Sequence, residues 1–221
     1  MRLSQIFGGA TQQPRISFEV FPPRTPKAEE SLRSTLADLV ALEPAYMTVT
    51  YGAMGSTRDK TVEIASFIRR TYDLPTACHL TCVGCSAAEI DAILDSIRAA
   101  GVENIVALRG DPPQGDETFV PPEGGFAHAN ELVAHIRRRG EFGIAVAGYP
   151  EKHIEAPDLD TDLHFLKQKV AAGADVIITQ LFYHNRDFFE FEERVRKLGI
   201  DCPVVPGLLP IVSSKQIRKI A

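Results

Sequence analysis

The sequence predicts an α/β fold, a (β/α)8 TIM barrel that here lacks its eighth β-α unit. Short runs rich in β-branched and aromatic residues alternate with helical patterns along the 221 residues. The runs begin about 27 to 39 residues apart, the size of one β-α repeat. No G-x-G-x-x-G follows the first run, and G-x-x-x-x-G-K-[ST] occurs nowhere, which disfavours an open nucleotide-binding sheet.

Seven strands are expected, and strict alternation with helices favours a parallel sheet covered by helices. A closed barrel of about 250 residues needs one more β-α unit after the last of them. We therefore expect a single barrel catalytic domain over residues 1–221 that is incomplete at its C-terminus. The expected strands are Ile16–Phe21, Tyr46–Tyr51, Thr76–Val83, Asn104–Leu108, Gly143–Gly148, Asp175–Phe182 and Cys202–Pro206.

The helices between the strands carry start and stop signals. Thr25 followed by Pro26 is typical of an N-cap and first helical residue. Ser86 with Glu89 three residues later matches a capping box. Glycine tolerates the left-handed conformation that ends helices, and four helical patterns stop at one: Gly101, Gly140, Gly173 and Gly199.

Polar residues gather at the carboxyl ends of the expected strands. An open sheet focuses its ligand at one switch point, whereas a barrel collects residues from all its strand ends. The distribution favours the barrel: Glu19, Thr50, His79, Arg109, Asp111, Tyr149 and Gln180.

Composition excludes several classes of protein. Hydrophobic residues make up 44% of the chain, as in ordinary globular domains, and the net charge of −5 disfavours binding to nucleic acid. No apolar run approaches the roughly 20 residues that span a bilayer, and the N-terminus does not match a signal peptide. Four cysteines without a secretion signal indicate a reducing, cytoplasmic location.

Glu19 is the candidate general acid. It has the opposite parity from Phe18 and Val20, so its carboxyl group is expected to point into the barrel mouth. Desolvation there would raise its pKa and let it hold a proton near neutral pH. The alternative is a structural ion pair with an arginine such as Arg24.

Arg109, Gly110 and Asp111 follow the fourth expected strand directly. Glycine would let the backbone approach a planar or phosphorylated ligand, and Asp111 could accept hydrogen bonds from a heterocycle. The alternative is a turn that only caps the following loop, Gly110–Phe126, which is rich in proline and glycine.

Other strand-end groups have two interpretations each. His79, Tyr149 and His153 supply two imidazoles and a phenol near two strand ends. Lys169 is either an anion ligand or a helix lysine that extends to solvent. Gln180 suits recognition of an amide-like ring edge, or it could bond inside the barrel.

A zinc site is the weaker hypothesis for one cysteine-rich strand. Cys78, Cys82 and Cys85 lie near His79 in sequence, and a barrel metalloenzyme could use them. However, Cys78 and Cys82 share one face of a strand and His79 faces the other way. Packed core cysteines are the favoured interpretation, and no metal is expected.

Eight segments, in order along the chain, resemble the methylenetetrahydrofolate reductases, in particular the bacterial, FAD-dependent type. F-E-x-F-P-P-[RK], A-L-R-G-D and I-T-Q-[LF]-F are jointly specific, and the likeness runs from about residue 16 to the end. The segments are ISFEVFPPRT (16–25), TVTYGAMGSTRDKT (48–61), HLTCVG (79–84), ENIVALRGD (103–111), AGYPEKH (147–153), LKQKVAAGAD (166–175), ITQLFY (178–183) and PGLLPI (206–211).

The resemblance implies reduction of 5,10-methylenetetrahydrofolate to 5-methyltetrahydrofolate, with FAD as cofactor and NADH or NADPH as co-substrate. It implies that Glu19 is the general acid, that Asp111 reaches the pterin and that Gln180 contacts the folate. Thr50 would lie near the nicotinamide. The remaining residues that it assigns to the FAD site are Tyr51, Ala53, His79, Arg109, Gly110, Asp111, Ala129, Tyr149, His153, Asp162 and Lys169.

The family pattern also implies a cytoplasmic homo-oligomer when the protein is full length, with no membrane or nucleic-acid partner. His128, Phe165 and Gln168 depart from residues common in the family and are expected to alter packing on the adenosine side. The family continues about 70 residues further, so the alternative is a truncated, catalytically impaired remnant that binds flavin.

Overall fold

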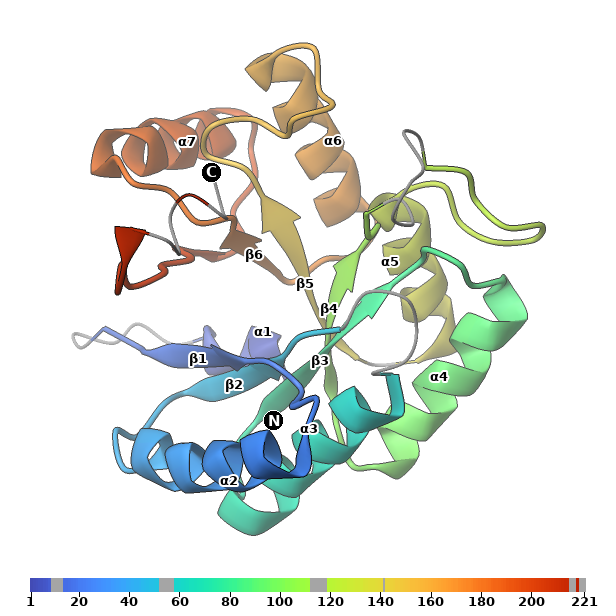
Figure 1. The fold of residues 1–221 in the computed structure, drawn as a ribbon. Coiled ribbons are helices and arrows are strands. Elements are labelled where there is room, and N and C mark those ends of the chain that lie inside the picture. Colours follow the sequence, from blue (N-terminus) through green and yellow to red (C-terminus); the bar gives the residue numbers. More distant parts are fainter. Residues whose placement is uncertain (9–13, 52–57, 112–118, 141, 215–217, 219–221) are drawn as a thin grey trace.

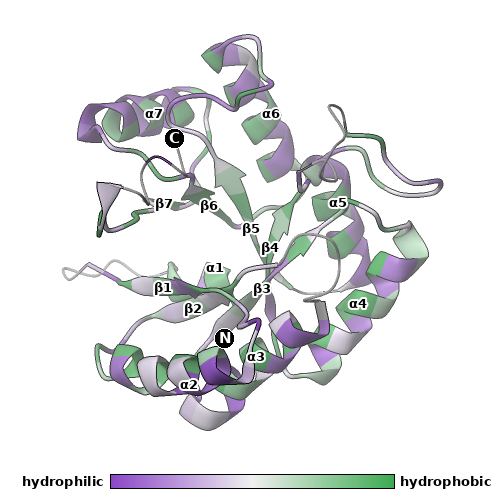
Figure 2. Cartoon of the chain, viewed as in Figure 1, coloured by the Kyte–Doolittle hydropathy of each residue, from purple (hydrophilic) through white to green (hydrophobic). Residues whose placement is uncertain are grey.

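A computed structural model describes residues 1–8, 14–51, 58–111, 119–140, 142–214 and 218. Within these ranges, seven strands form one sheet in the order β1 to β7, and each neighbouring pair is parallel. The sheet curls so that its edges, β1 and β7, come round to the same side, while the longer helices lie outside the curve (Figures 1 and 2). This is the architecture of a (β/α) barrel, as predicted.

Every expected strand is present, although most are shorter than predicted. The strands are β1 (Ser17–Val20), β2 (Tyr46–Val49), β3 (Thr76–Thr81), β4 (Asn104–Leu108), β5 (Gly143–Gly148), β6 (Val176–Thr179) and β7 (Val204–Val205). The helices are α1 (Leu3–Ile6), α2 (Pro26–Val40), α3 (Arg58–Tyr72), α4 (Ala87–Ala99), α5 (Ala129–Arg139), α6 (Leu159–Ala171) and α7 (Asn185–Lys197). The short β7 lies between Pro203 and Pro206, neither of which can donate a ladder hydrogen bond.

The helix signals are confirmed. Thr25 caps α2 by accepting a hydrogen bond from the backbone N–H of Ala28 at 3.2 Å. At α4, the Ser86 N–H donates to the Glu89 carboxylate at 2.8 Å, and the Glu89 N–H donates back to the Ser86 hydroxyl at 3.4 Å. All four predicted stop glycines have positive φ, at 79°, 155°, 121° and 73° in chain order.

Alternate residues along each strand belong to two different hydrophobic clusters. Residues of one parity pack beneath the surrounding helices, for example Val49, Cys78, Ile105, Val146 and Ile177. Residues of the other parity fill the barrel interior: Tyr46, Ala77, Val106, Ala145 and Val176. Figure 2 shows hydrophobic colour in the central strands and hydrophilic colour over much of the surrounding helices. No helix in the described part of the chain is both long and apolar enough to cross a membrane.

The N-terminal segment closes the interior, a role that the sequence analysis missed. Leu3 and Ile6 of α1 are 0% and 6% exposed and join the interior cluster. Asn104 fixes this segment, because its side chain accepts from the Leu3 N–H at 2.8 Å and donates to the Met1 carbonyl at 3.1 Å. Gly143 leaves the necessary room, since a Cβ there would lie 2.2 Å from Oδ1 of Asn104.

We expect Leu3→Ala to lower the free energy of unfolding by roughly 2–5 kcal/mol, because it leaves a cavity among buried side chains. Ser4→Ala on the exposed side of the same helix is the matched control and should change it by less than about 0.5 kcal/mol. Urea unfolding of both variants measures the difference. Equal stabilities would show that α1 does not contribute to the core.

Candidate active site

Glu19, Thr48 and His79 meet at the interior face of three adjacent strands. The register pairs Glu19 of β1 with Thr48 of β2, and the Thr48 hydroxyl donates to Oε2 of Glu19 at 3.4 Å. Nε2 of His79, on β3, lies 3.4 Å from the same oxygen. The side chain of His79 is 11% exposed and that of Glu19 is 47% exposed. Thr48 was not among the predicted site residues, although its parity matches that of Glu19 across the strand pair.

The expectation of a raised Glu19 pKa is wrong for the described chain. Partial burial raises the pKa of Glu19, but the His79 imidazole and the Thr48 hydroxyl together lower it further, so its pKa lies below the ordinary value. The cause is that interaction with two polar neighbours outweighs desolvation of a carboxyl group that is still half exposed.

A cavity of about 340 Å³ opens between the ends of β4 and β5 and the helices α5 and α6. Six of the expected cofactor residues line it: Arg109, Ala129, Tyr149, His153, Asp162 and Lys169. The three positions that depart from the family pattern line the same cavity: His128, Phe165 and Gln168.

Arg109 is held on the cavity wall by Glu155, a residue that the sequence analysis did not single out. Both terminal nitrogens of Arg109 donate to the two Glu155 oxygens, one at 2.7 Å, and its Nε donates to the Gly110 carbonyl at 3.2 Å. The hydrogen bonds and charge of Arg109 lower the pKa of Glu155. Because Glu155 lies in an irregular loop, no periodicity in the sequence marked it.

Lys169 brings a buried amine to the same cavity. Its Nζ donates to the Ala147 carbonyl at 2.6 Å and lies 5.7 Å from the centre of the Tyr149 ring. Burial lowers the pKa of Lys169 to about 8, although Asp162 raises it in part. The anion-ligand interpretation is therefore geometrically possible, because the amine faces the cavity instead of extending to solvent.

Tyr149, His153 and Asp162 form the floor of the cavity. The His153 and Tyr149 rings are in edge-to-face contact, with centroids 4.7 Å apart. The backbone N–H of His153 donates to the Asp162 carboxylate at 3.0 Å. Burial, followed by the nearby carboxylates of Asp162 and Asp111, raises the pKa of Tyr149 to about 12. Tyr149 is therefore a neutral phenol at physiological pH.

Gly110 is required by close packing within the chain. Its φ is +89°, and a Cβ would lie 2.7 Å from Cγ1 of Val83 and 3.1 Å from Cβ of Thr81. The close approach that the structure shows is to the end of β3, and the approach of a ligand to Gly110 stays a prediction. This packing lets the Arg109–Asp111 turn fold down against the strand that carries His79.

The remaining predicted residues differ in burial. Thr50 is buried and its carbonyl accepts from the Thr61 hydroxyl at 2.9 Å, whereas Tyr51 is half-buried. Asp111 and Gln180 are exposed, and the Gln180 side chain accepts from the Leu181 N–H at 3.3 Å. Ala53 lies outside the described residues.

The cysteine-rich strand packs as the parity of its residues predicted. Cys78, Cys82 and Cys85 belong to the cluster beneath the helices, while His79 faces the interior. Burial raises the pKa of Cys78 to about 12 and that of Cys82 to about 11, so both are protonated thiols. No group of three or more metal-ligating side chains occurs within the ranges that the structure covers.

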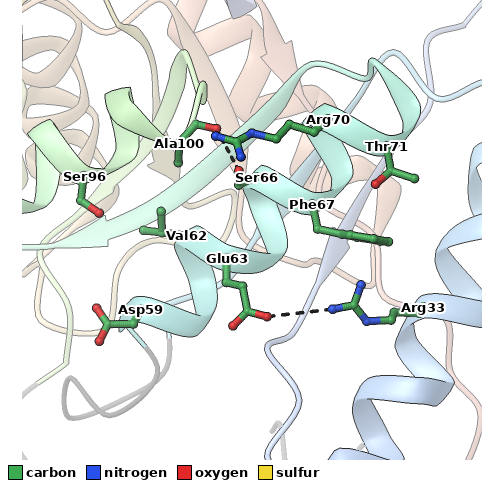
Figure 3. A pocket seen from close by; sticks show the side chains of 10 residues that line it. All are labelled: Arg33, Asp59, Val62, Glu63, Ser66, Phe67, Arg70, Thr71, Ser96 and Ala100. Carbon is green, nitrogen blue, oxygen red and sulfur yellow. Dashed lines mark hydrogen bonds and ion pairs between the residues drawn. The ribbon is translucent and has the colours of Figure 1, made fainter.

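A larger hollow of about 580 Å³ lies away from the strand ends, among α2, α3 and α4 (Figure 3). Charged and aromatic contacts of the outer surface border it: the Arg33 guanidinium lies 4.2 Å from the Phe67 ring centre and 3.9 Å from Glu63. Since none of the expected site residues lines it, we place the candidate active site at the strand ends.

Comparison with known proteins agrees with the motifs. The family model "Methylenetetrahydrofolate reductase" matches residues 2–221. The chain is 47% identical over 220 residues to "Methylenetetrahydrofolate reductase (NADH) 1" of Arabidopsis thaliana, covering 95% of the chain and 37% of that protein. It is 39% identical over 219 residues to "5,10-methylenetetrahydrofolate reductase" of Escherichia coli K12, covering 99% of the chain and 72% of that protein. The chain thus spans little more than a third of the plant relative.

Solved structures support the fold at low sequence identity. An uncharacterised protein from Clostridium thermocellum that binds two copies of 5-methyl-5,6,7,8-tetrahydrofolic acid superposes with a TM-score of 0.66 at 13% identity, covering 93% of this chain and 69% of that one. A phosphoenolpyruvate phosphomutase from Streptomyces platensis gives 0.64 at 13% identity, covering 92% and 71%. Because the family model matches nearly every residue and the strand-end motifs are in place, the chain belongs to the methylenetetrahydrofolate reductase family.

Proposed function

We propose that this chain carries the catalytic site of an enzyme that reduces 5,10-methylenetetrahydrofolate to 5-methyltetrahydrofolate, using FAD and either NADH or NADPH. The observation that carries the proposal is the cavity whose wall holds Arg109, Tyr149 and Lys169, together with the Glu19–His79 pair inside the same barrel. The names of the plant and bacterial relatives support the same reaction. A single catalytic domain, cytoplasmic location and homo-oligomeric assembly of the whole protein are part of the proposal.

The residues present fit FAD. Two cationic side chains, Arg109 and Lys169, stand in one cavity and suit the phosphates of a dinucleotide. Among the described residues, the buried Oγ1 of Thr81 has no hydrogen-bond partner, and Nε2 of His79 has no partner in hydrogen-bond geometry beyond its 3.4 Å contact with Glu19. Such atoms favour a site that a polar ligand completes, because an unpaired buried polar group is costly.

FAD would supply the two-electron relay between the nicotinamide and the folate. The chain would hold and orient the partners: Arg109 and Lys169 pair with phosphate oxygens, while Tyr149 packs in the cavity as a neutral phenol. Asp111 and Gln180, which are solvent-exposed, can hydrogen-bond to a folate that lies over the strand ends. Thr50 and Tyr51 follow β2 at the same end of the barrel, where Thr50 would border the nicotinamide and Tyr51 the flavin.

Glu19 would donate the proton that opening of the folate's five-membered ring requires at N10. A folate lying over Glu19 would exclude water from a carboxyl group that is 47% exposed in the described chain. That desolvation raises its pKa toward the value a general acid needs, while the Thr48 hydroxyl and His79 fix its orientation. If ligand binding did not raise the Glu19 pKa, the chain would correspond to the flavin-binding remnant, with little folate turnover.

Glu19→Gln should slow the folate half-reaction by two orders of magnitude or more, because the amide cannot donate a carboxylic acid proton. Reduction of the flavin by NAD(P)H should be nearly unchanged. Stopped-flow absorbance of the flavin measures each half-reaction separately. Glu30→Gln on the exposed side of α2 is the control; equal slowing of both half-reactions in the Glu19 variant would assign Glu19 a structural role.

Affinity for FAD should fall as pH rises above about 8. The Lys169 pKa of about 8 means that its positive charge is present below this pH and is lost above it. A bound phosphate prefers the charged amine, so the dissociation constant should rise by up to about tenfold per pH unit above 8. Fluorescence titration at pH 7, 8 and 9 measures the profile.

Lys169→Met should bind FAD more weakly at pH 7 and show a flat profile from pH 7 to 9. Lys167→Met, which removes an exposed lysine of the same helix, should keep the wild-type profile. A Lys169→Met profile as steep as that of the wild type would mean that another group titrates.

A further inference from the structure

The only two buried side-chain nitrogen or oxygen atoms without a hydrogen-bond partner in the described ranges lie on one strand. They are Nε2 of His79 and Oγ1 of Thr81, two residues apart on β3. Residues two apart in a strand face the same side. That side is the interior, because Ala77 belongs to the interior cluster, whereas Cys78, Leu80 and Cys82 belong to the cluster beneath the helices.

No hydrogen-bond partner for the Thr81 hydroxyl occurs within the described ranges. The nearby carbonyls of Leu108 and Arg109 already accept from the backbone N–H groups of Cys82 and Val83, at 3.3 and 3.1 Å. Valine would fill the same space as threonine without burying an unpaired hydroxyl. Thr179, another buried threonine at the end of a strand (β6), does have a partner, since its hydroxyl accepts from the Gly207 N–H at 2.9 Å.

Thr81 also lies next to the expected cofactor residues. A Cβ on Gly110 would come within 3.1 Å of Cβ of Thr81, so the Arg109–Asp111 turn rests directly on this side chain. Leu108, which is paired with Thr81 in the β3–β4 register, lines the 340 Å³ cavity. Thr81 is therefore next to the wall of the cavity that holds Arg109 and Lys169.

We infer that the Thr81 hydroxyl is a further binding contact for the flavin ring, acting together with Nε2 of His79. A hydroxyl can donate and accept at once, and a neutral imidazole nitrogen does one or the other. Two such groups on one side of a strand can hydrogen-bond to N–H and carbonyl groups along the edge of a planar heterocycle. This inference rests on the proposed function, because it takes FAD as the ligand.

The test compares Thr81→Val with Thr81→Ser and with Thr179→Val. In protein stripped of flavin, Thr81→Val should leave the melting temperature unchanged or raise it, because it removes an unpaired buried hydroxyl. Thr179→Val should lower the melting temperature, because it leaves the Gly207 N–H without its acceptor. Circular dichroism of the stripped proteins measures both.

Titration of the same proteins with FAD tests the contact itself. Thr81→Val should weaken FAD binding about fivefold to tenfold, the loss of one hydrogen bond, and Thr81→Ser should restore most of the affinity. A Thr81→Val protein that binds FAD as tightly as the wild type would overturn the inference. So would a fall in its melting temperature like that of Thr179→Val, since the hydroxyl would then be structural.

Titration with 5-methyltetrahydrofolate separates the two planar ligands. Thr81→Val should bind it as the wild type does; a loss confined to the folate would overturn the flavin assignment. If the wild type itself takes up no FAD, the proposed function fails together with the ligand named here. If the wild type binds FAD and Thr81→Val binds it equally well, the inference about Thr81 fails and the proposed function stands.

Discussion

The two-residue period of parallel strands is the constraint on which the rest of the structure depends. It sends Val49, Cys78 and Ile105 beneath the helices and Tyr46, Ala77 and Val106 into the interior. In-register pairing of Glu19 with Thr48 then brings polar interior residues of neighbouring strands together at one end. A slip of one residue in any strand would move its polar group into the apolar layer beneath the helices.

The two ends of the interior have opposite characters. At the amino end, Leu3 and Ile6 fill the space and Asn104 satisfies the backbone that enters there. At the carboxyl end, the Thr81 hydroxyl has no hydrogen-bond partner among the described residues, Nε2 of His79 has only its 3.4 Å contact with Glu19, and burial lowers the pKa of the Lys169 amine. An unpaired buried polar group costs free energy. In this fold that cost falls at the carboxyl end of the barrel, where a bound ligand can offset it.

Charge pairing in the site shows why the pKa and the partners of each site residue were harder to predict from the sequence than its place at a strand end. Burial alone would raise the Glu19 pKa, but His79 and Thr48, 60 and 29 positions along the chain, reverse the direction. Arg109 forms a bidentate ion pair with Glu155, which lies 46 positions away in a loop. Pairwise electrostatic effects fall off with distance between atoms, which spacing in the sequence does not reveal.

The sequence by itself determined the seven strands, their parallel order, the caps at Thr25 and Ser86, and six of the residues that line the cavity. These follow from local periodicity, local capping chemistry and short motifs. Only the tertiary structure decided that α1 fills the interior, that Glu155 holds Arg109 and that Glu19 has a lowered pKa. It also decided that the Thr81 hydroxyl is buried without a partner. Each of these depends on which side chains from distant segments come within a few ångströms of one another, and folding of the whole chain sets those distances.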